Sequence, residues 1–327
     1  ALQAVEAWAK LDDGASPSLE SSELASVCVR CTDKSSHVRT QAARTLSALY
    51  GAAPHLTDLR GAWIDSVLPL VRDSEASVAD AALEAVDAFA LTPLADCGSD
   101  PDAALGEPLW LLLQPMGASS QPPVEAAIAS LERQGKLPRL VGKSAQQLLS
   151  LEDLSPQGRA SLWSILHGVA VLPKATSSRI DLATLVWSVR NAPQALPDEV
   201  MALRTLLGLA TRGGVPKARC TELRNELVAR LRAPSGTGSS AATSACANVC
   251  ITLEALIGAG PGAWVAELRD AATSVICRAA SHPSSPCASS LERALVIAGE
   301  LALVAGTPAM EEIVVEAASE LLMRVHW

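Results

Sequence analysis

The chain has 327 residues, a formal net charge of −9 and hydrophobic residues at 49% of its positions, yet Phe and Tyr occur only once each. A core made of Ala, Leu and Val suits closely packed helices better than a sheet, so we predict an all-α fold. The acidic balance argues against a protein that grips phosphates along its whole length. No uninterrupted apolar run reaches the roughly 18 residues that a membrane span needs, so we expect no membrane contact.

The first third of the chain reads as helical hairpins. Residues 1–11 have the pattern of a second helix whose partner is missing, and the first complete hairpin is predicted at about Leu19–Tyr50. A second hairpin begins at Asp58, and Pro69 should bend its first helix because proline removes a backbone donor.

These two hairpins repeat each other with a period of 40 residues. The matching pairs are Asp33 and Asp73, Val38 and Val78, Ala42 and Ala82, and Leu46 and Val86. A hairpin cannot bury its apolar face alone, so this period predicts a HEAT/armadillo-type α-solenoid of stacked antiparallel helix pairs. The alternative is a coincidental similarity between two alanine-rich helices.

The remaining sequence predicts one continuous solenoid over residues 1–327, with regular repeats in 1–91, a loop in 92–102 and degenerate helical repeats in 103–327. A flexible link is expected at 233–240, which is rich in Gly and Ser. Helices are predicted at about 103–114, 123–134, 143–151, 156–171, 177–191, 197–211, 216–232, 241–258, 263–281, 288–305 and 308–325.

The chain begins without Met and stops inside a helical pattern, which predicts an internal fragment of a longer protein. Its eight cysteines are scattered through helical patterns and do not resemble a disulfide framework. We therefore expect a reducing compartment, either cytosol or nucleus.

Three segments carry a resemblance to a known family. Trp63–Phe89, WIDSVLPLVRDSEASVADAALEAVDAF, resembles a HEAT unit of the D-type non-SMC subunit of condensin II, with its Trp, acid, proline and Asp-Ser turn in the same order. Ser161–Val189 is similar to the family's pair of Trp-containing helices around a proline turn, and Ser289–Leu322 to its leucine-rich helix followed by a helix that starts with proline. One departure is Ala79, where HEAT units often have Arg.

The resemblance implies a non-catalytic scaffold that binds the kleisin subunit and the SMC ATPase heterodimer of condensin, contacts DNA or chromatin, and acts in mitotic chromosome condensation in the nucleus. The repeat alone fits another HEAT-repeat adaptor equally well, such as a nuclear transport receptor or a phosphatase scaffold.

No motif predicts a cofactor, metal or small-molecule substrate. Cys28 and Cys31, and likewise Cys246 and Cys250, have ligand spacing but lack a second pair nearby, so we interpret them as core residues. The Gly-Lys-Ser at 142–144 lacks the earlier glycine of a phosphate-binding loop, and the glycines at 236 and 238 follow a polar helix, not a strand.

The five histidines, His37, His55, His167, His282 and His326, stand in unrelated surroundings. No nucleophile, base and acid can be assembled from sequence order, so we expect no enzyme active site.

One basic segment is the candidate for contact with nucleic acid. Between Arg204 and Arg232 seven bases face two acids, Glu222 and Glu226, which leaves a local charge of +5. The candidate phosphate contacts are Arg212, Lys217, Arg219, Arg224, Arg230 and Arg232, with a smaller second group at Lys136, Arg139 and Lys143. The alternative is a solvated helix face with a Glu226 to Arg230 pair.

The chain has seven tryptophans, and those inside helical patterns include Trp63, Trp163, Trp187 and Trp264. We expect them to fill the space that small alanine side chains leave in the core.

Overall fold

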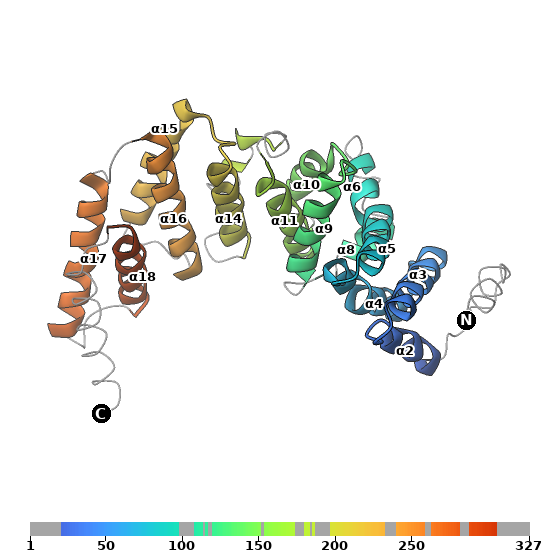
Figure 1. Ribbon diagram of the computed structural model, residues 1–327. Helices are drawn as coiled ribbons and strands as arrows, with labels where there is room; N and C mark the ends of the chain where they lie inside the picture. The colour runs from blue at the N-terminus through green and yellow to red at the C-terminus, as the bar shows by residue number, and fades with distance from the viewer. Residues whose placement is uncertain are drawn as a thin grey trace. The chain divides into compact units, whose positions relative to one another are not determined.

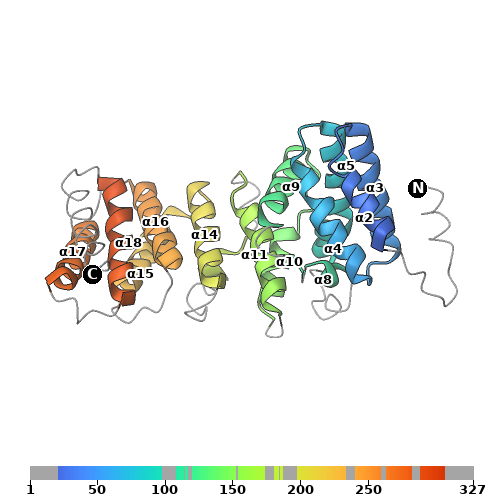
Figure 2. The same cartoon turned by 90° about the horizontal axis from the view of Figure 1, so that it is seen from below.

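The computed structural model describes residues 21–97, 108–113, 115–116, 120–151, 154–173, 180–183, 185–186, 197–232, 240–258, 263–281 and 288–305. Every regular element within these residues is helical and none is a strand, which confirms the predicted all-α class (Figures 1 and 2). The predicted helices at 1–11 and 308–325, most of that at 177–191, and the link at 233–239 lie outside the described residues.

The chain forms two compact units, Ala1–Asp181 and Leu182–Trp327, and each is described by itself. Unit 1 contains the helices α2 Ser21–Arg30, α3 Ser36–Ala52, α4 Thr57–Ser66, η1 Leu68–Arg72, α5 Ala76–Val86, η2 Asp87–Leu91, α6 Thr92–Asp96, α8 Pro108–Leu113, α9 Gln121–Arg133, α10 Val141–Leu149 and α11 Pro156–Ala170. Packing runs mostly between near neighbours in the chain, such as α3 with α5 and α9 with α11.

Unit 2 contains α14 Pro197–Thr211, α15 Lys217–Arg232, α16 Ser240–Ile257, α17 Ala263–Ser281 and α18 Ala288–Ala305. The bounds of these five helices lie within one residue of those that hydrophobic periodicity predicts. Helix α16 packs against α14, α15 and α18, so it lies at the centre of the unit.

Helix α16 is long and apolar enough to cross a membrane by length and composition alone, with a mean hydropathy of 1.4 over 18 residues. Half of it is buried inside the unit. It also carries Ser244, Asn248 and Glu254, whose side chains all form hydrogen bonds to other helices. These features are those of a core helix.

Two proline predictions have opposite outcomes. The bend at Pro69 is confirmed, because α4 stops at Ser66 and the chain continues as the short 3-10 helix η1. The loop predicted at 92–102 is wrong in its first half, where Thr92–Asp96 forms α6. Pro93 lies in the first turn of that helix, and the π-helical turn η2 leads into it without a break.

The only Tyr and the only Phe of the chain meet in the core of unit 1. The ring of Tyr50 stacks on Trp63 with centroids 5.6 Å apart and meets Phe89 edge-on at 5.1 Å, while Trp63 and Phe89 lie 6.0 Å apart. The cluster joins α3, α4 and η2. Trp63 also donates its indole N–H to Ser47 Oγ at 3.1 Å, which satisfies a polar atom that would otherwise be buried without a partner.

The two copies of the repeat have the same local geometry. Asp33 Oδ1 accepts the N–H of Ser35 and Asp73 Oδ1 accepts the N–H of Glu75, each at 2.9 Å, so both aspartates fix the turn before the second helix of a hairpin. Of the apolar positions that match, Ala42, Leu46, Ala82 and Val86 are buried. The repeat is therefore structural and more than a shared abundance of alanine.

A bidentate ion pair joins the two hairpins. Arg39 donates from Nε and Nη2 to the two carboxylate oxygens of Asp73, both at 2.8 Å, and from Nη1 to the carbonyl oxygen of Asp33 at 2.9 Å. The side chains of Arg39 and Asp73 are only 14% and 9% exposed. The position that corresponds to Arg39 in the second hairpin is Ala79, which cannot extend the series.

The Arg39–Asp73 pair predicts acid sensitivity of unit 1. The Arg39 guanidinium holds the pKa of Asp73 below its ordinary value of 3.8. The pKa of Asp73 is therefore lower in the folded state than in the unfolded state. The pair stabilises the fold fully above the unfolded pKa, and this stabilisation is lost as the pH falls through the folded pKa. We expect Asp73→Asn to lower stability at pH 7 and to flatten its fall below about pH 4, measured by urea unfolding followed by circular dichroism.

Asp65→Asn is the matched control, because Asp65 lies exposed on α4. Equal pH profiles for the two variants would contradict the assignment.

Candidate functional site

The candidate basic segment forms the end of α14, a tight turn and the whole of α15. Gly213, at φ 69°, ends α14 in the left-handed conformation that glycine adopts without strain. Its N–H and that of Gly214 donate to the carbonyl oxygens of Ala210 and Leu209 at 3.0 and 2.8 Å. The buried stripe of α15 consists of Cys220, Leu223, Leu227, Val228 and Leu231. This stripe holds the helix against the unit and leaves the arginines on its other faces.

Arg224 is engaged in the core of unit 2. Its Nη1 lies 2.6 Å from Glu254 Oε2 of α16, and the same oxygen accepts the indole N–H of Trp264 of α17 at 3.0 Å. The Arg224 and Glu254 side chains are 17% and 7% exposed. A carboxylate at this depth needs its cation, so Arg224 joins three helices and is not available to phosphate.

Arg230 and Arg232 also pair with carboxylates from other helices. Arg230 forms an ion pair with the nearly buried Glu199 of α14, and Arg232 forms one with Glu267 of α17. The predicted pair of Glu226 with Arg230 stays a prediction, and the partner described for Arg230 is Glu199.

Two of the six predicted contacts keep an open position. Arg212 and Lys217 are exposed in the turn before α15 and at its first residue, and no described carboxylate lies within ion-pair distance of either. Arg219 pairs with Glu222 of its own helix at 3.0 Å, and both side chains are more than half exposed. These three cations make the N-terminal end of α15 the part of the segment that could meet an anion. Five of the six candidates thus lie on α15 and Arg212 lies in the turn before it, and their contacts differ.

The sequence reasoning missed Arg293 of α18. Its Nη2 donates to the backbone oxygens of Arg230 and Leu231 at 2.7 and 3.1 Å, which satisfies carbonyls at the C-terminal end of α15. Burial lowers the pKa of this guanidinium. It lies 62 residues or more from its acceptors, so no local pattern could have indicated it.

A second polar contact joins α16 to α18. Glu300 accepts hydrogen bonds from Ser244 Oγ and, at 3.0 Å, from Asn248 Nδ2. All three side chains are half-buried, and both partners of Glu300 come from one face of α16. These bonds specify how α16 and α18 align.

The prediction that Cys28, Cys31, Cys246 and Cys250 are core residues is confirmed for three of the four. Cys31, Cys246 and Cys250 are buried and Cys28 is half-buried. Burial raises the pKa of Cys31 to about 11, and the hydrogen bond with Cys246 raises the pKa of Cys250. Thiols in this state are poor nucleophiles and metal ligands. Within the described residues no group of three or more His, Cys, Asp or Glu side chains could hold a metal ion.

The phosphate-loop fragment at 142–144 lies inside α10. Gly142 packs where an added Cβ would lie 3.3 Å from Val169, and the Ser144 hydroxyl donates to the carbonyl oxygen of Ala95 at 3.4 Å. Both residues therefore serve helix packing. The glycines at 236 and 238 lie outside the described residues.

The tryptophan prediction is confirmed at three positions. Trp63, Trp163 and Trp264 are buried, with exposed fractions of 1%, 4% and 7%. Trp187 lies outside the described residues.

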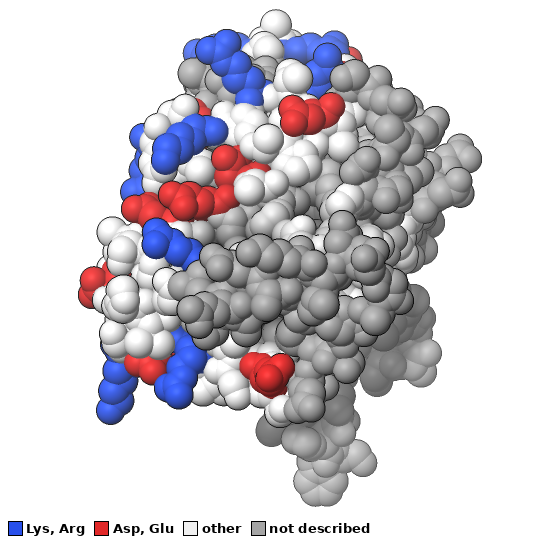
Figure 3. All heavy atoms as spheres, turned by 90° about the vertical axis from the view of Figure 1, so that its right-hand side faces the viewer, with Lys and Arg blue, Asp and Glu red and all other residues white. Residues whose placement is uncertain are grey.

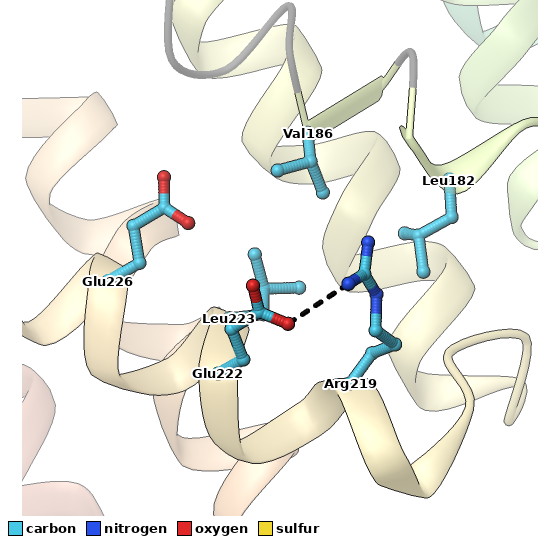
Figure 4. Close-up of a pocket in the computed structure, with 6 residues that line it drawn as sticks. All are labelled: Leu182, Val186, Arg219, Glu222, Leu223 and Glu226. Atoms are coloured by element: carbon cyan, nitrogen blue, oxygen red, sulfur yellow. Dashed lines mark hydrogen bonds and ion pairs between the residues drawn. The ribbon is translucent and has the colours of Figure 1, made fainter.

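A shallow hollow lies beside the N-terminal half of α15 (Figure 4). It is lined by Leu182, Val186, Arg219, Glu222, Leu223 and Glu226. In Figure 4 the Arg219 side chain points along the helix surface to Glu222, so the charged rim of the hollow is internally paired on that side.

Charged side chains of both signs lie on the face of the molecule that Figure 3 presents. Figure 3 shows acidic side chains beside basic ones on the face that it presents, with white surface between them. A broad basic surface of the kind that tracks duplex DNA is not seen on the described part of that face.

Comparison with known proteins gives one partial relative. The chain is 38% identical over 71 residues to condensin-2 complex subunit D3-L of Xenopus laevis, a match that covers 22% of this chain and 5% of that subunit. The chain therefore aligns with a small part of the relative's length. No family model matches.

Among solved structures, an engineered protein matches over 85% of this chain and 96% of its own, at 15% identity and a TM-score of 0.26. A TM-score this low says nothing of the fold. The comparisons thus support a relation to one subunit of condensin-2 over a limited stretch.

The Arg224–Glu254 pair yields a prediction on stability. Removing Arg224 leaves a buried carboxylate with only the Trp264 N–H, so Arg224→Ala should cost about 3 kcal/mol of unfolding free energy. The variant that also carries Glu254→Ala should recover part of this loss, because it no longer buries an unpaired charge. Chemical denaturation of the three variants measures the coupling.

Arg212→Ala is the control, and it should change stability by less than about 0.5 kcal/mol because the residue is exposed. Additive losses in the double variant would contradict a direct pair.

Proposed function

We propose that this chain is a segment of a HEAT-type α-solenoid scaffold related to the D-type subunits of condensin II. The observation that carries the proposal is the 40-residue repeat in which Asp33 and Asp73 fix equivalent turns and Arg39 joins one hairpin to the next. A solenoid buries its core only by stacking such hairpins, and the Arg39–Asp73 pair joins successive hairpins. The partial match to a condensin-2 subunit supports the same assignment.

The role that we propose is non-catalytic. In unit 2 three arginines, Arg224, Arg230 and Arg232, pair with glutamates of other helices, and Trp264 donates to Glu254, so these groups stabilise the packing between helices. Catalysis would need a nucleophile or a base held open toward a substrate, whereas these groups are engaged in packing. A scaffold instead needs stiff helices and surfaces that a partner chain can follow.

The proposed partners are the kleisin subunit and the SMC ATPase heterodimer of condensin, on chromatin in the nucleus. They follow from the resemblance of Trp63–Phe89 and the two later segments to the condensin II family. Exposed helix faces on stacked hairpins provide an extended surface for a peptide-like partner.

The proposal predicts co-purification. The full-length protein that contains this segment, tagged and isolated from mitotic cells at moderate salt, should bring down a kleisin and both SMC ATPases in near-equal amounts. Recovery of nuclear pore or cargo proteins, or of a phosphatase catalytic subunit, in place of these would refute it and favour another HEAT adaptor. Deleting the segment from the full-length protein should reduce recovery of the kleisin if the segment itself binds that subunit.

Binding to DNA is assigned to the N-terminal end of α15. Changing Arg212, Lys217 and Arg219 to glutamate should weaken binding to duplex DNA and reduce the salt slope by about 0.9 for each phosphate that is no longer neutralised. Changing Lys34, Arg44 and Arg72, which are exposed on unit 1, makes the same difference in net charge and serves as control. If the two triple variants weaken DNA binding equally, this end of α15 is a solvent-exposed helix face and not a DNA contact.

A further inference from the structure

We propose that the turn between α9 and α10 is a docking surface for an acidic peptide that carries an apolar side chain. The surface, here called the basic turn, consists of Lys136, Arg139, Leu140 and Lys143. The inference concerns unit 1 and goes beyond the proposed scaffold role, because it assigns a separate surface and the chemistry of its partner.

The fold holds the basic turn rigidly. Gly135, at φ 68°, ends α9, and the N–H groups of Gly135 and Lys136 donate to Glu132 and Leu131 carbonyl oxygens, both at 2.9 Å. Leu137 and Val141 are buried within the turn and at the start of α10, at 7% and 1% exposed. A peptide that binds here therefore orders little of the receptor, which keeps the entropic cost of binding low.

The four residues of the basic turn lie within eight positions of the chain and all four are exposed. Arg139 and Leu140 directly precede α10, and Lys143 lies in its first turn. Leu140 is 52% exposed, one of two large hydrophobic side chains in the described part of the chain that reach such exposure. An apolar side chain is therefore presented among cations.

Positive charge at the basic turn is not neutralised locally. Residues 133–151 contain four bases and no acid, and none of the carboxylates that the structure describes lies within ion-pair distance of Lys136, Arg139 or Lys143. The arginines of α15 differ, because carboxylates from other helices reach them. The N-terminal end of α10 adds partial positive charge, since its N-cap Leu140 has no side-chain oxygen to accept the first N–H groups.

The partner is a peptide and not duplex DNA for two reasons. Leu140 would face water or phosphate in a DNA complex, whereas an apolar peptide side chain would cover it. An acid also lies beside the turn, because Asp80 is close enough to accept a hydrogen bond from Gln134 at 3.4 Å. Asp80 would repel the phosphates of a duplex that extends past the turn, whereas a short peptide can bind the cations without reaching that carboxylate.

The test uses the whole chain and fluorescence anisotropy of a short labelled peptide of glutamate and leucine. We expect binding to weaken about tenfold when Lys136, Arg139 and Lys143 are all changed to glutamate. Changing Lys34, Arg44 and Arg72 to glutamate is the control of equal charge, and it should leave binding unchanged. Leu140→Ser keeps every charge and should weaken binding only by removing the apolar surface that the peptide leucine covers.

Three results would overturn the proposal. The first is equal weakening by the two charge reversals, which would mean a general charge effect. The second is equal binding of a glutamine and leucine peptide, which would remove the need for acids. The third is displacement of the peptide by duplex DNA together with no effect of Leu140→Ser, which would make the turn a phosphate-binding site. A folded state is checked for each variant by circular dichroism, and glutamine replacements of the three cations give a milder second set.

Discussion

Within each unit, ion pairs between residues 30 to 35 positions apart in the chain hold neighbouring helices together. Arg39 reaches Asp73 across 34 residues, Arg224 reaches Glu254 across 30, Arg230 reaches Glu199 across 31 and Arg232 reaches Glu267 across 35. The separations are similar because, in each pair, the cation and the carboxylate lie on elements that are close to each other in chain order. A core built largely from Ala and Leu offers few large side chains to fix the register of the helices, and paired charges help to supply that register. Arg232 and Glu267 are 48% and 58% exposed, whereas the other three pairs have limited exposure. Such pairs are costly to break one side at a time, which makes them specific even where their net stabilisation is modest.

A cluster of aromatic side chains also fixes how the helices of unit 1 pack. Tyr50, Trp63 and Phe89 come from three elements of unit 1 and pack as one cluster. The π-helical turn at Asp87–Leu91 carries Phe89, and its wider turn changes the direction in which following side chains point. Gly51 permits the approach, because an added Cβ would lie 3.2 Å from the Phe89 ring.

Hydrophobic periodicity predicted the helices well because each amphipathic face is a local property. The bounds of α14 to α18 show this most clearly. The 40-residue repeat was visible for a related reason, since Asp33 and Asp73 act on N–H groups two residues away. The predicted loop was wrong at Thr92–Asp96 because turn residues were weighed without the burial of Leu94 and Ala95, which holds α6 against the core. Tertiary packing overrode local propensity there.

The sequence was a weaker guide to the candidate site. It shows how many bases a segment contains, but it does not show which carboxylates from other helices lie close to them in the folded protein. The segment around α15 has the larger excess of bases, yet Glu199, Glu254 and Glu267 arrive from other helices and engage three of its arginines. The turn between α9 and α10 has fewer bases and keeps them open. The difference follows from position: a helix packed on several sides meets the carboxylates of its neighbours, whereas a turn at the end of a hairpin projects beyond them. Cations in such turns are therefore better candidates for a partner than a longer basic run on a packed helix, and Leu140, exposed among them, indicates what else that partner carries.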